Sequence, residues 1–213
     1  MGDESKIITI IRHGETEWNR IGRQQGHLDS PLSEEGIKQA EMLANYLENK
    51  GYEVLYSSSL GRAVQTAEII NKKLKLKHIK DDALRERHLG IIQGSTIEEF
   101  ENNYPDEYEK FRSNDPEYVI PDGESINQRY ARTIDCMNKI ARRTDFKKYL
   151  IVTHGGNLES IFKYVLGIPL DKKRNFSIFN SSLNNFEYDS GKWTMLTWGD
   201  ISPLEGFVVL DDF

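Results

Sequence analysis

The chain has 213 residues, of which 38% are hydrophobic and 29% charged, and its net charge is −6. It can bury a core, but its apolar runs fall well short of the roughly 20 residues of a membrane helix, and an acidic chain argues against nonspecific nucleic-acid binding. The single cysteine, Cys136, excludes an intrachain disulfide and a cysteine-based metal cage. Because the N-terminal residues also lack the apolar stretch of a signal peptide, we expect a cytoplasmic protein.

Strands and helices are predicted to alternate through the first half of the chain. Residues Lys6–Arg12 are almost continuously apolar, which predicts a buried parallel strand. Ser33 can N-cap an amphipathic helix that ends near Gly51. A short strand over 54–56 and a second helix over 61–71 follow, and residues 81–94 lack periodicity, which indicates a loop.

The second half continues the alternation after an acidic and aromatic segment. Pro105 divides residues 95–112 into short helices, and residues 116–123 are rich in turn formers, so we expect a cap-like insertion at about 95–120. The remaining predicted elements are a helix over 124–143, a strand over 149–153, a helix over 157–166, and strands over 176–179, 183–188 and 193–198.

These elements predict an α/β protein, built as a three-layer sandwich. The alternation favours a mostly parallel sheet with an antiparallel edge strand and helices on both faces. The sequence contains no linker, so residues 1–213 are expected to form a single domain.

Two of the buried strands end in the same way. IITIIRHG ends with His13 and a glycine, and YLIVTHGG ends with His154 and Gly155. Parallel sheets bind ligands at the carboxyl ends of their strands, so neighbouring strands would bring both histidines to one rim, where the glycines let a ligand approach. Arg12 offers a fork of donors that matches phosphate or carboxylate oxygens, and Arg62 lies in the first turn of a helix, which suits an anion.

Five ordered blocks resemble the histidine phosphatase superfamily, in its phosphoglycerate-mutase-like branch. They are RHGETEWN, QGHLDSPLSEEG, SSSLGRAVQTAE, LRERHLG and VTHGG, and the resemblance spans Ile7 to about Gly167. It implies that His13 attacks the phosphoryl group through one ring nitrogen and forms a phosphohistidine, which water then hydrolyses. It also implies that Glu86 protonates the leaving oxygen and later acts as a base on the attacking water.

The same resemblance supplies the rest of the expected site. The phosphoryl group would be bound by Arg12, Asn19, Arg62, His154 and Gly155, with His154 cationic beside the bound dianion. No metal or cofactor is required, because these groups supply the positive charge. Gln25 and Gly26 are the expected substrate contacts, and Arg23, Lys110 and Arg112 are candidates for binding a substrate carboxylate. We expect His27 and His78 at the surface, His88 in a structural loop role and Cys136 in the core.

The resemblance leaves three functions open. Mutases of this branch carry a longer insertion with two adjacent arginines, whereas YEKFRSND here has Arg112 alone. They also tend to have tyrosine where this chain has Leu89 and asparagine where it has Gly156. These departures favour a phosphatase for small phosphomonoesters of the phosphoserine or phosphoglycerate type. A phosphoglycerate mutase and a catalytically weak protein that binds phosphorylated ligands are the alternatives. The expected partner is a small phosphorylated metabolite, with no nucleic acid or membrane, and the chain would be a monomer or homodimer.

Overall fold

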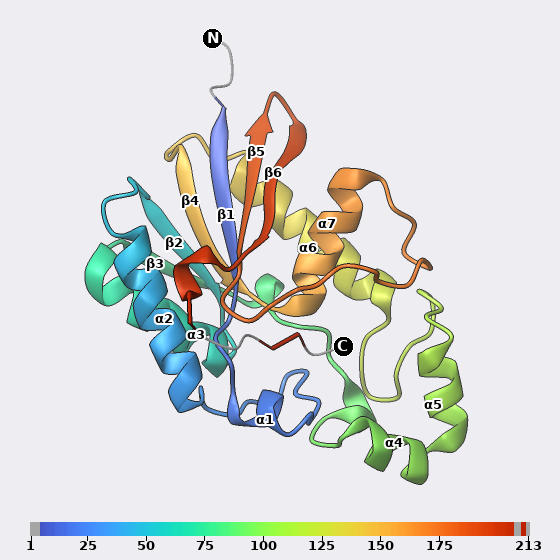
Figure 1. Cartoon of the computed structure of the whole chain (residues 1–213). Helices are drawn as coiled ribbons and strands as arrows, with labels where there is room; N and C mark the ends of the chain where they lie inside the picture. The colour runs from blue at the N-terminus through green and yellow to red at the C-terminus, as the bar shows by residue number, and fades with distance from the viewer. Residues whose placement is uncertain (1–4, 207–209, 212–213) are drawn as a thin grey trace.

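A six-stranded sheet forms the centre of the computed structural model, which describes residues 5–206 and 210–211. Its strands are β1 (Lys6–Arg12), β2 (Val54–Ser58), β3 (Lys77–Asp81), β4 (Lys148–Thr153), β5 (Leu183–Asp189) and β6 (Lys192–Asp200), in the order β3-β2-β4-β1-β5-β6 (Figure 1). The first four strands are parallel, and β5 runs antiparallel to both of its neighbours. Arg12 of β1 lies opposite Thr153 of β4, so the two His-Gly strand ends are neighbours.

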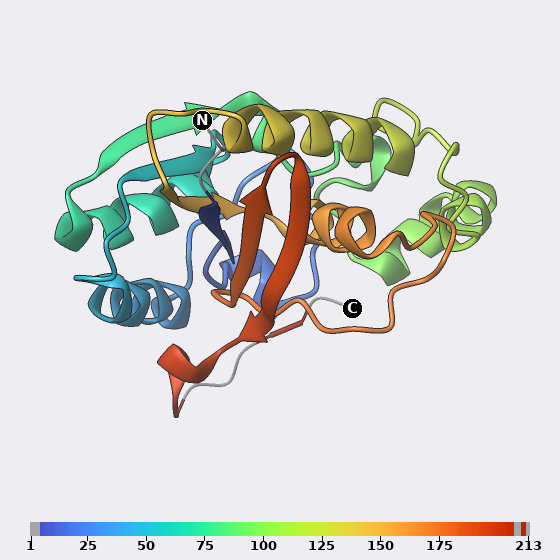
Figure 2. The ribbon, with the colours of Figure 1, turned by 90° about the horizontal axis from the view of Figure 1, so that it is seen from above.

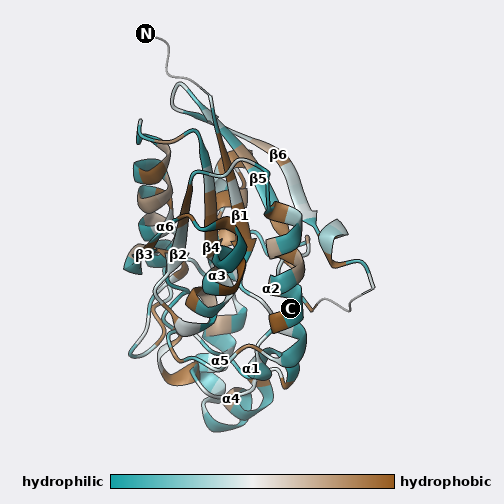
Figure 3. Cartoon of the chain, turned by 90° about the vertical axis from the view of Figure 1, so that its left-hand side faces the viewer, coloured by the Kyte–Doolittle hydropathy of each residue, from teal (hydrophilic) through white to brown (hydrophobic). Residues whose placement is uncertain are grey.

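Helices cover both faces of this sheet (Figure 2). One face carries α2 (Glu34–Leu47) and α3 (Gly61–Leu74), and the other carries α6 (Ile126–Ala141) and α7 (Gly155–Leu166). Successive strand residues point to opposite faces, and Ile10 accordingly packs with the α6 and α7 side while Ile11 packs with α2 and α3. The apolar residues therefore gather at the strands in the middle layer (Figure 3), and the predicted α/β fold is confirmed.

Short helices gather at the carboxyl end of the parallel strands (Figure 1). They are α1 (Glu17–Arg20), α4 (Ile97–Asn103) and α5 (Pro105–Arg112), and 3-10 turns occur at Asp82–Leu84, Gly90–Ile92 and Ser202–Leu204. Pro105 is the first residue of α5, where its missing N–H costs no hydrogen bond. A separate small apolar cluster of Ile92, Phe100 and Ile120 supports α4 and α5, so the segment expected to form the cap has packing of its own.

One observed strand was not predicted, and one predicted strand is absent from the described residues. Strand β3 was not anticipated, because KHIKD is half exposed at the sheet edge and lacks an apolar signature. Residues 176–179, expected to form a strand, are irregular. Their apolar character serves packing instead, since the Phe176 ring stacks on Phe162 with centroids 3.8 Å apart.

Other boundaries agree closely with the sequence. Ser33 N-caps α2 by accepting a hydrogen bond from Gly36 N at 3.0 Å, and Cys136 is buried as expected. Helix α7 begins at Gly155, two residues earlier than predicted. Among the residues that the structure describes, no helix has both the length and the apolarity required to cross a bilayer.

Candidate active site

His13 follows directly after β1 and has a defined tautomer. Its Nδ1 lies 2.8 Å from the carbonyl oxygen of Gly14, which can only accept, so Nδ1 carries the proton and Nε2 holds the lone pair. Nε2 in turn accepts a hydrogen bond from Arg62 Nε at 3.2 Å. Burial, and then the cations Arg62 and Arg12, lower the pKa of His13 well below its ordinary value. The ring is therefore neutral and has the form of a nucleophile.

His154 lies beside His13, as the neighbouring strand ends predicted. The two ring centroids are 5.2 Å apart, and His154 is the N-cap residue of α7. Its Nε2 is 2.8 Å from Ser58 Oγ at the end of β2, whereas Nδ1 is buried with no hydrogen-bond partner among the described residues. Burial and then Arg62 lower its pKa, so the cationic form expected beside a phosphate would have to be induced by the bound dianion.

Two buried guanidinium groups flank the histidines. Arg12 donates to the carbonyl oxygen of Ile178, and burial lowers its pKa to about 10. Arg62 is 2% exposed, and its Nη1 donates to Asp29 Oδ1 at 2.9 Å. Two buried positive charges so close to the histidines create a strong local preference for an anion.

Glu86 lies against the first turn of α7. Its Oε2 accepts from Gly156 N at 2.9 Å and its Oε1 from Arg87 N at 2.8 Å. The Glu86 carbonyl oxygen also lies 2.8 Å from His27 Nε2. His27 is thus half-buried and supports the Glu86 loop, which corrects its expected surface position. The carboxyl is held by the backbone N–H of Gly156, at the start of the helix that follows His154, and by that of Arg87. It is therefore placed close to a ligand bound at the histidines.

The remaining predicted residues divide into cavity-lining and supporting roles. Asn19, Gly155 and Arg112 line the cavity, Arg112 at its exposed side. Gln25 also lines it, but its amide nitrogen donates to Thr16 Oγ1 at 2.9 Å. Gly26 contributes a carbonyl oxygen that accepts from Arg62 Nη2 at 2.8 Å.

Three other side chains had expected positions or roles that the structure can be compared with. Lys110 lies outside the cavity, with its Nζ 2.7 Å from Glu107, which corrects its expected role as a carboxylate ligand. Arg23 lines the cavity and is paired with Glu99 at 3.0 Å. His78 is half-buried, with its Nε2 2.8 Å from Ser57 Oγ, rather than at the surface.

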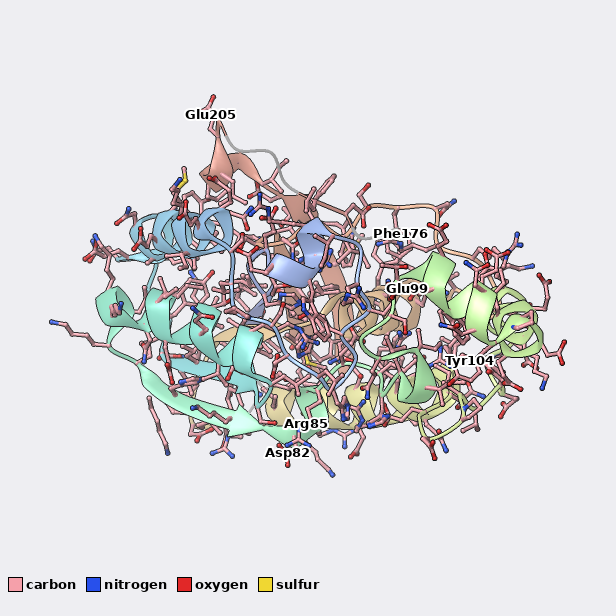
Figure 4. All side chains as sticks on the ribbon, turned by 90° about the horizontal axis from the view of Figure 1, so that it is seen from below. Asp82, Arg85, Glu99, Tyr104, Phe176 and Glu205 are labelled. Atoms are coloured by element: carbon pink, nitrogen blue, oxygen red, sulfur yellow. The ribbon has the colours of Figure 1, made fainter. Side chains whose placement is uncertain are left out.

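The cavity is lined by more basic side chains than the sequence indicated. Its volume is about 940 Å³, and it extends from His13 to Phe176 in the segment after α7, while His154 lies behind this lining. Phe176 and Glu99 of α4 are labelled among the side chains in Figure 4. The basic residues that line the cavity are Arg12, Arg23, Arg62, Arg87, Arg112, Arg129, Lys173 and Arg174, and the acidic ones are Glu86, Glu159 and Asp211. An acidic protein thus presents a cationic pocket.

Sequence reasoning missed Arg87, Arg129 and Arg174 as lining residues. Arg129 had a readable signal, because it follows the inward-facing Ile126 by three positions on a helix and therefore shares its buried face. Arg174 lies in an irregular segment, where no periodicity could place it. Among the described residues, no cluster of three His, Cys, Asp or Glu side chains could hold a metal ion.

Comparisons with known proteins identify the family of the chain. The family model of the histidine phosphatase superfamily (branch 1) matches residues 8–201. The chain is 39% identical to phosphoglycerate mutase-like protein 4 of Arabidopsis thaliana, covering 93% of this chain and 86% of the relative. It is 36% identical to a metal-independent phosphoserine phosphatase of the same plant, covering 94% and 85%. The solved structure of Bacillus stearothermophilus YhfR superposes with a TM-score of 0.88 at 32% identity, covering 94% of this chain and 100% of that one. The chain therefore belongs to the histidine phosphatase superfamily.

Proposed function

We propose that the protein is a metal-independent phosphatase that hydrolyses small phosphomonoesters, of the phosphoserine or phosphoglycerate type, in the cytoplasm. The observation that carries this proposal is the fixed tautomer of His13, whose Nε2 faces the buried guanidinium of Arg62. A neutral imidazole nitrogen among buried cations is arranged to attack a phosphoryl group. The similarity to a metal-independent phosphoserine phosphatase supports the substrate class.

The reaction divides into two displacements at phosphorus. In the first, His13 Nε2 forms a bond to phosphorus while the P–O bond to the leaving group breaks, and Glu86 gives that oxygen a proton. In the second, water attacks the phosphohistidine, Glu86 takes the proton of the water, and His13 leaves with inorganic phosphate as the product. Arg12, Arg62 and a protonated His154 would stabilise the charge on the equatorial oxygens in both steps.

Hydrolysis of p-nitrophenyl phosphate, with His13→Ala as the control, tests this mechanism. We expect turnover by the wild type between pH 5 and 8, an acid-labile phosphoryl group trapped on the wild-type protein, and neither of them with the variant. A wild type without turnover would favour the alternative of a protein that only binds phosphorylated ligands.

A mutase remains the second candidate, because a similar relative is named phosphoglycerate mutase-like. The feature against it is Gly156, where a β-carbon would overlap both Glu86 Oε1 and Arg129 Nη1. The asparagine expected there in mutases would therefore require the side chains of Glu86 and Arg129 to move from the positions they have here. Incubation with 3-phosphoglycerate separates the two activities, since a phosphatase releases inorganic phosphate and a mutase forms 2-phosphoglycerate, stimulated by 2,3-bisphosphoglycerate.

A further inference from the structure

We infer that Arg129 is a specificity-determining residue that binds a carboxylate on the leaving-group side of the substrate; this inference rests on the proposed phosphatase function. Arg129 lies in the first turn of α6, is 6% exposed and lines the cavity. Its Nε is buried without a hydrogen-bond partner among the described residues. A buried guanidinium with an unsatisfied donor is costly unless a ligand completes it.

The position of Arg129 relative to the proton donor defines the part of the substrate that it would contact. Gly156 N donates to Glu86 Oε2, and the missing side chain of Gly156 lets Glu86 Oε1 and Arg129 Nη1 approach the same point on α7. Since Glu86 protonates the leaving oxygen, a cation next to Glu86 faces the leaving group and not the transferred phosphoryl group.

The carboxylate that pairs with Arg129 also pairs with a second buried cation. Glu159 Oε2 lies 3.5 Å from Arg129 Nη2, and Glu159 Oε1 lies 2.8 Å from Lys163 Nζ. Burial opposes the ionisation of Glu159, but Arg129 and Lys163 outweigh it and lower its pKa. The Glu159 carboxylate is therefore shared between two buried cations, and it lies closer to Lys163 than to Arg129.

Arg87 adds a further cation to this part of the cavity. It is buried, and its Nε and Nη2 donate to the carbonyl oxygens of Glu124 and Tyr118. Burial first, and then the nearby charge of Arg129, lower the pKa of Arg87 to about 10. A substrate anion bound beside Arg129 would therefore face two buried guanidinium groups.

Two substrates that differ only in the carboxylate provide the test. O-phosphoserine and O-phosphoethanolamine share the phosphate, the leaving oxygen and the amine, and 3-phosphoglycerate with glycerol 3-phosphate forms a second pair. The quantity to measure is the ratio of kcat/KM for the carboxylate substrate to that for its partner. We expect this ratio to exceed one in the wild type and to fall about 10- to 100-fold in Arg129→Met, mainly through KM, because a charge-assisted contact is lost.

Control variants distinguish this role from a structural one. Arg129→Lys keeps the charge but loses the planar fork, and should give an intermediate ratio. Arg142→Met, at the exposed end of the same helix, should keep the wild-type ratio. Arg112→Met tests the other arginine that could bind the carboxylate. An unchanged ratio in Arg129→Met, or a ratio lost in Arg112→Met alone, would overturn the inference.

Failure of this inference can be told apart from failure of the proposed function. Turnover of p-nitrophenyl phosphate with no preference for carboxylate substrates would refute the role of Arg129 and leave the phosphatase intact, even if Arg129→Met did not fold. Absence of all turnover would refute the phosphatase. The inference would then be tested by calorimetric binding of O-phosphoserine and O-phosphoethanolamine, where equal affinities of the wild type would refute it.

Discussion

Replacing Arg62 with methionine should affect stability and catalysis for separate reasons. The buried guanidinium donates to His13 Nε2 at 3.2 Å, to Asp29 Oδ1 and Leu28 O at 2.9 Å, and to Gly26 O at 2.8 Å. Methionine fills a similar volume without donors. The two carbonyl oxygens would lose their partners at about 1 kcal/mol each, whereas Asp29 is 35% exposed and can be resolvated. We expect the free energy of unfolding to fall by about 2–3 kcal/mol, measured by urea denaturation.

The catalytic effect of Arg62→Met should include a change in pH dependence. Burial is the largest cause of the lowered pKa of His13, and the charge of Arg62 is the next. Removing the cation raises the pKa of His13 toward its ordinary value, and a protonated Nε2 cannot attack phosphorus. The acid limb of kcat/KM should therefore move to higher pH, and kcat itself should fall about 10³-fold, because an arginine no longer stabilises the transition state.

Arg62→Lys separates the charge from the geometry. Lysine keeps a cation near His13 but cannot reproduce the bidentate fork, so we expect a large loss of kcat with the acid limb close to that of the wild type. An NMR titration of the His13 Cε1–H signal, assigned with His13→Gln, would report protonation directly. If the His13 signal titrated at the same pH in Arg62→Met as in the wild type, the coupling between these two side chains would be refuted.

Three further predictions concern other parts of the site. Glu86→Gln should lower kcat for O-phosphoserine about 10²- to 10⁴-fold, and much less for p-nitrophenyl phosphate, whose leaving group needs little protonation; comparable losses would remove the acid role. Glu159→Gln should destabilise the fold by about 1–3 kcal/mol in thermal denaturation at pH 7, because the buried Lys163 keeps only its two carbonyl acceptors, Leu170 and Lys172, and loses its carboxylate partner. Folding lowers the pKa of Glu159, so its carboxylate stabilises the folded protein above the pKa of the unfolded chain. This stabilisation is lost as the pH falls through the pKa of the folded protein. Glu159→Gln should therefore lose less stability on acidification than the wild type does. Gly36→Ala would overlap the carbonyl oxygen of Glu15, and is expected to reduce both stability, by about 2–4 kcal/mol, and turnover; wild-type values would contradict the close packing seen there.

The sequence predicted the pairing of the two His-Gly strand ends well because its signals are local. The apolar strand, the histidine and the following glycine occupy consecutive positions in both strand ends, so their placement depended only on β1 and β4 being neighbours. Strand β3 was missed because a half-exposed edge strand has no apolar run, and its pairing with β2 is a tertiary contact. The segment 176–179 failed for the opposite reason, since its apolar residues pack on α7 rather than in the sheet.

The basic lining of the cavity depends on tertiary structure in a different way. Arg12, Arg87, Arg129 and Arg174 come from a strand end, a loop, a helix and an irregular segment, which are far apart in the sequence. Their convergence has no signature in any short stretch. It explains, however, how a chain with a net charge of −6 can bind an anion, because the charge that matters is the local one in a buried cavity.

Position 156 connects the chemistry of this cavity to its choice of substrate. Its backbone N–H orients Glu86, and its missing side chain admits the guanidinium of Arg129 beside the same carboxyl. A larger residue there would displace the proposed proton donor, Glu86, and the proposed carboxylate ligand, Arg129, together. Proton donation by Glu86 and carboxylate recognition by Arg129 are therefore expected to be coupled. A side chain added at position 156 to favour mutase activity over hydrolysis should alter carboxylate recognition as well. Gly156→Asn tests this coupling. It should lower both kcat for p-nitrophenyl phosphate and the ratio of kcat/KM for O-phosphoserine to that for O-phosphoethanolamine. A variant in which only one of these two quantities falls would show that Glu86 and Arg129 act independently.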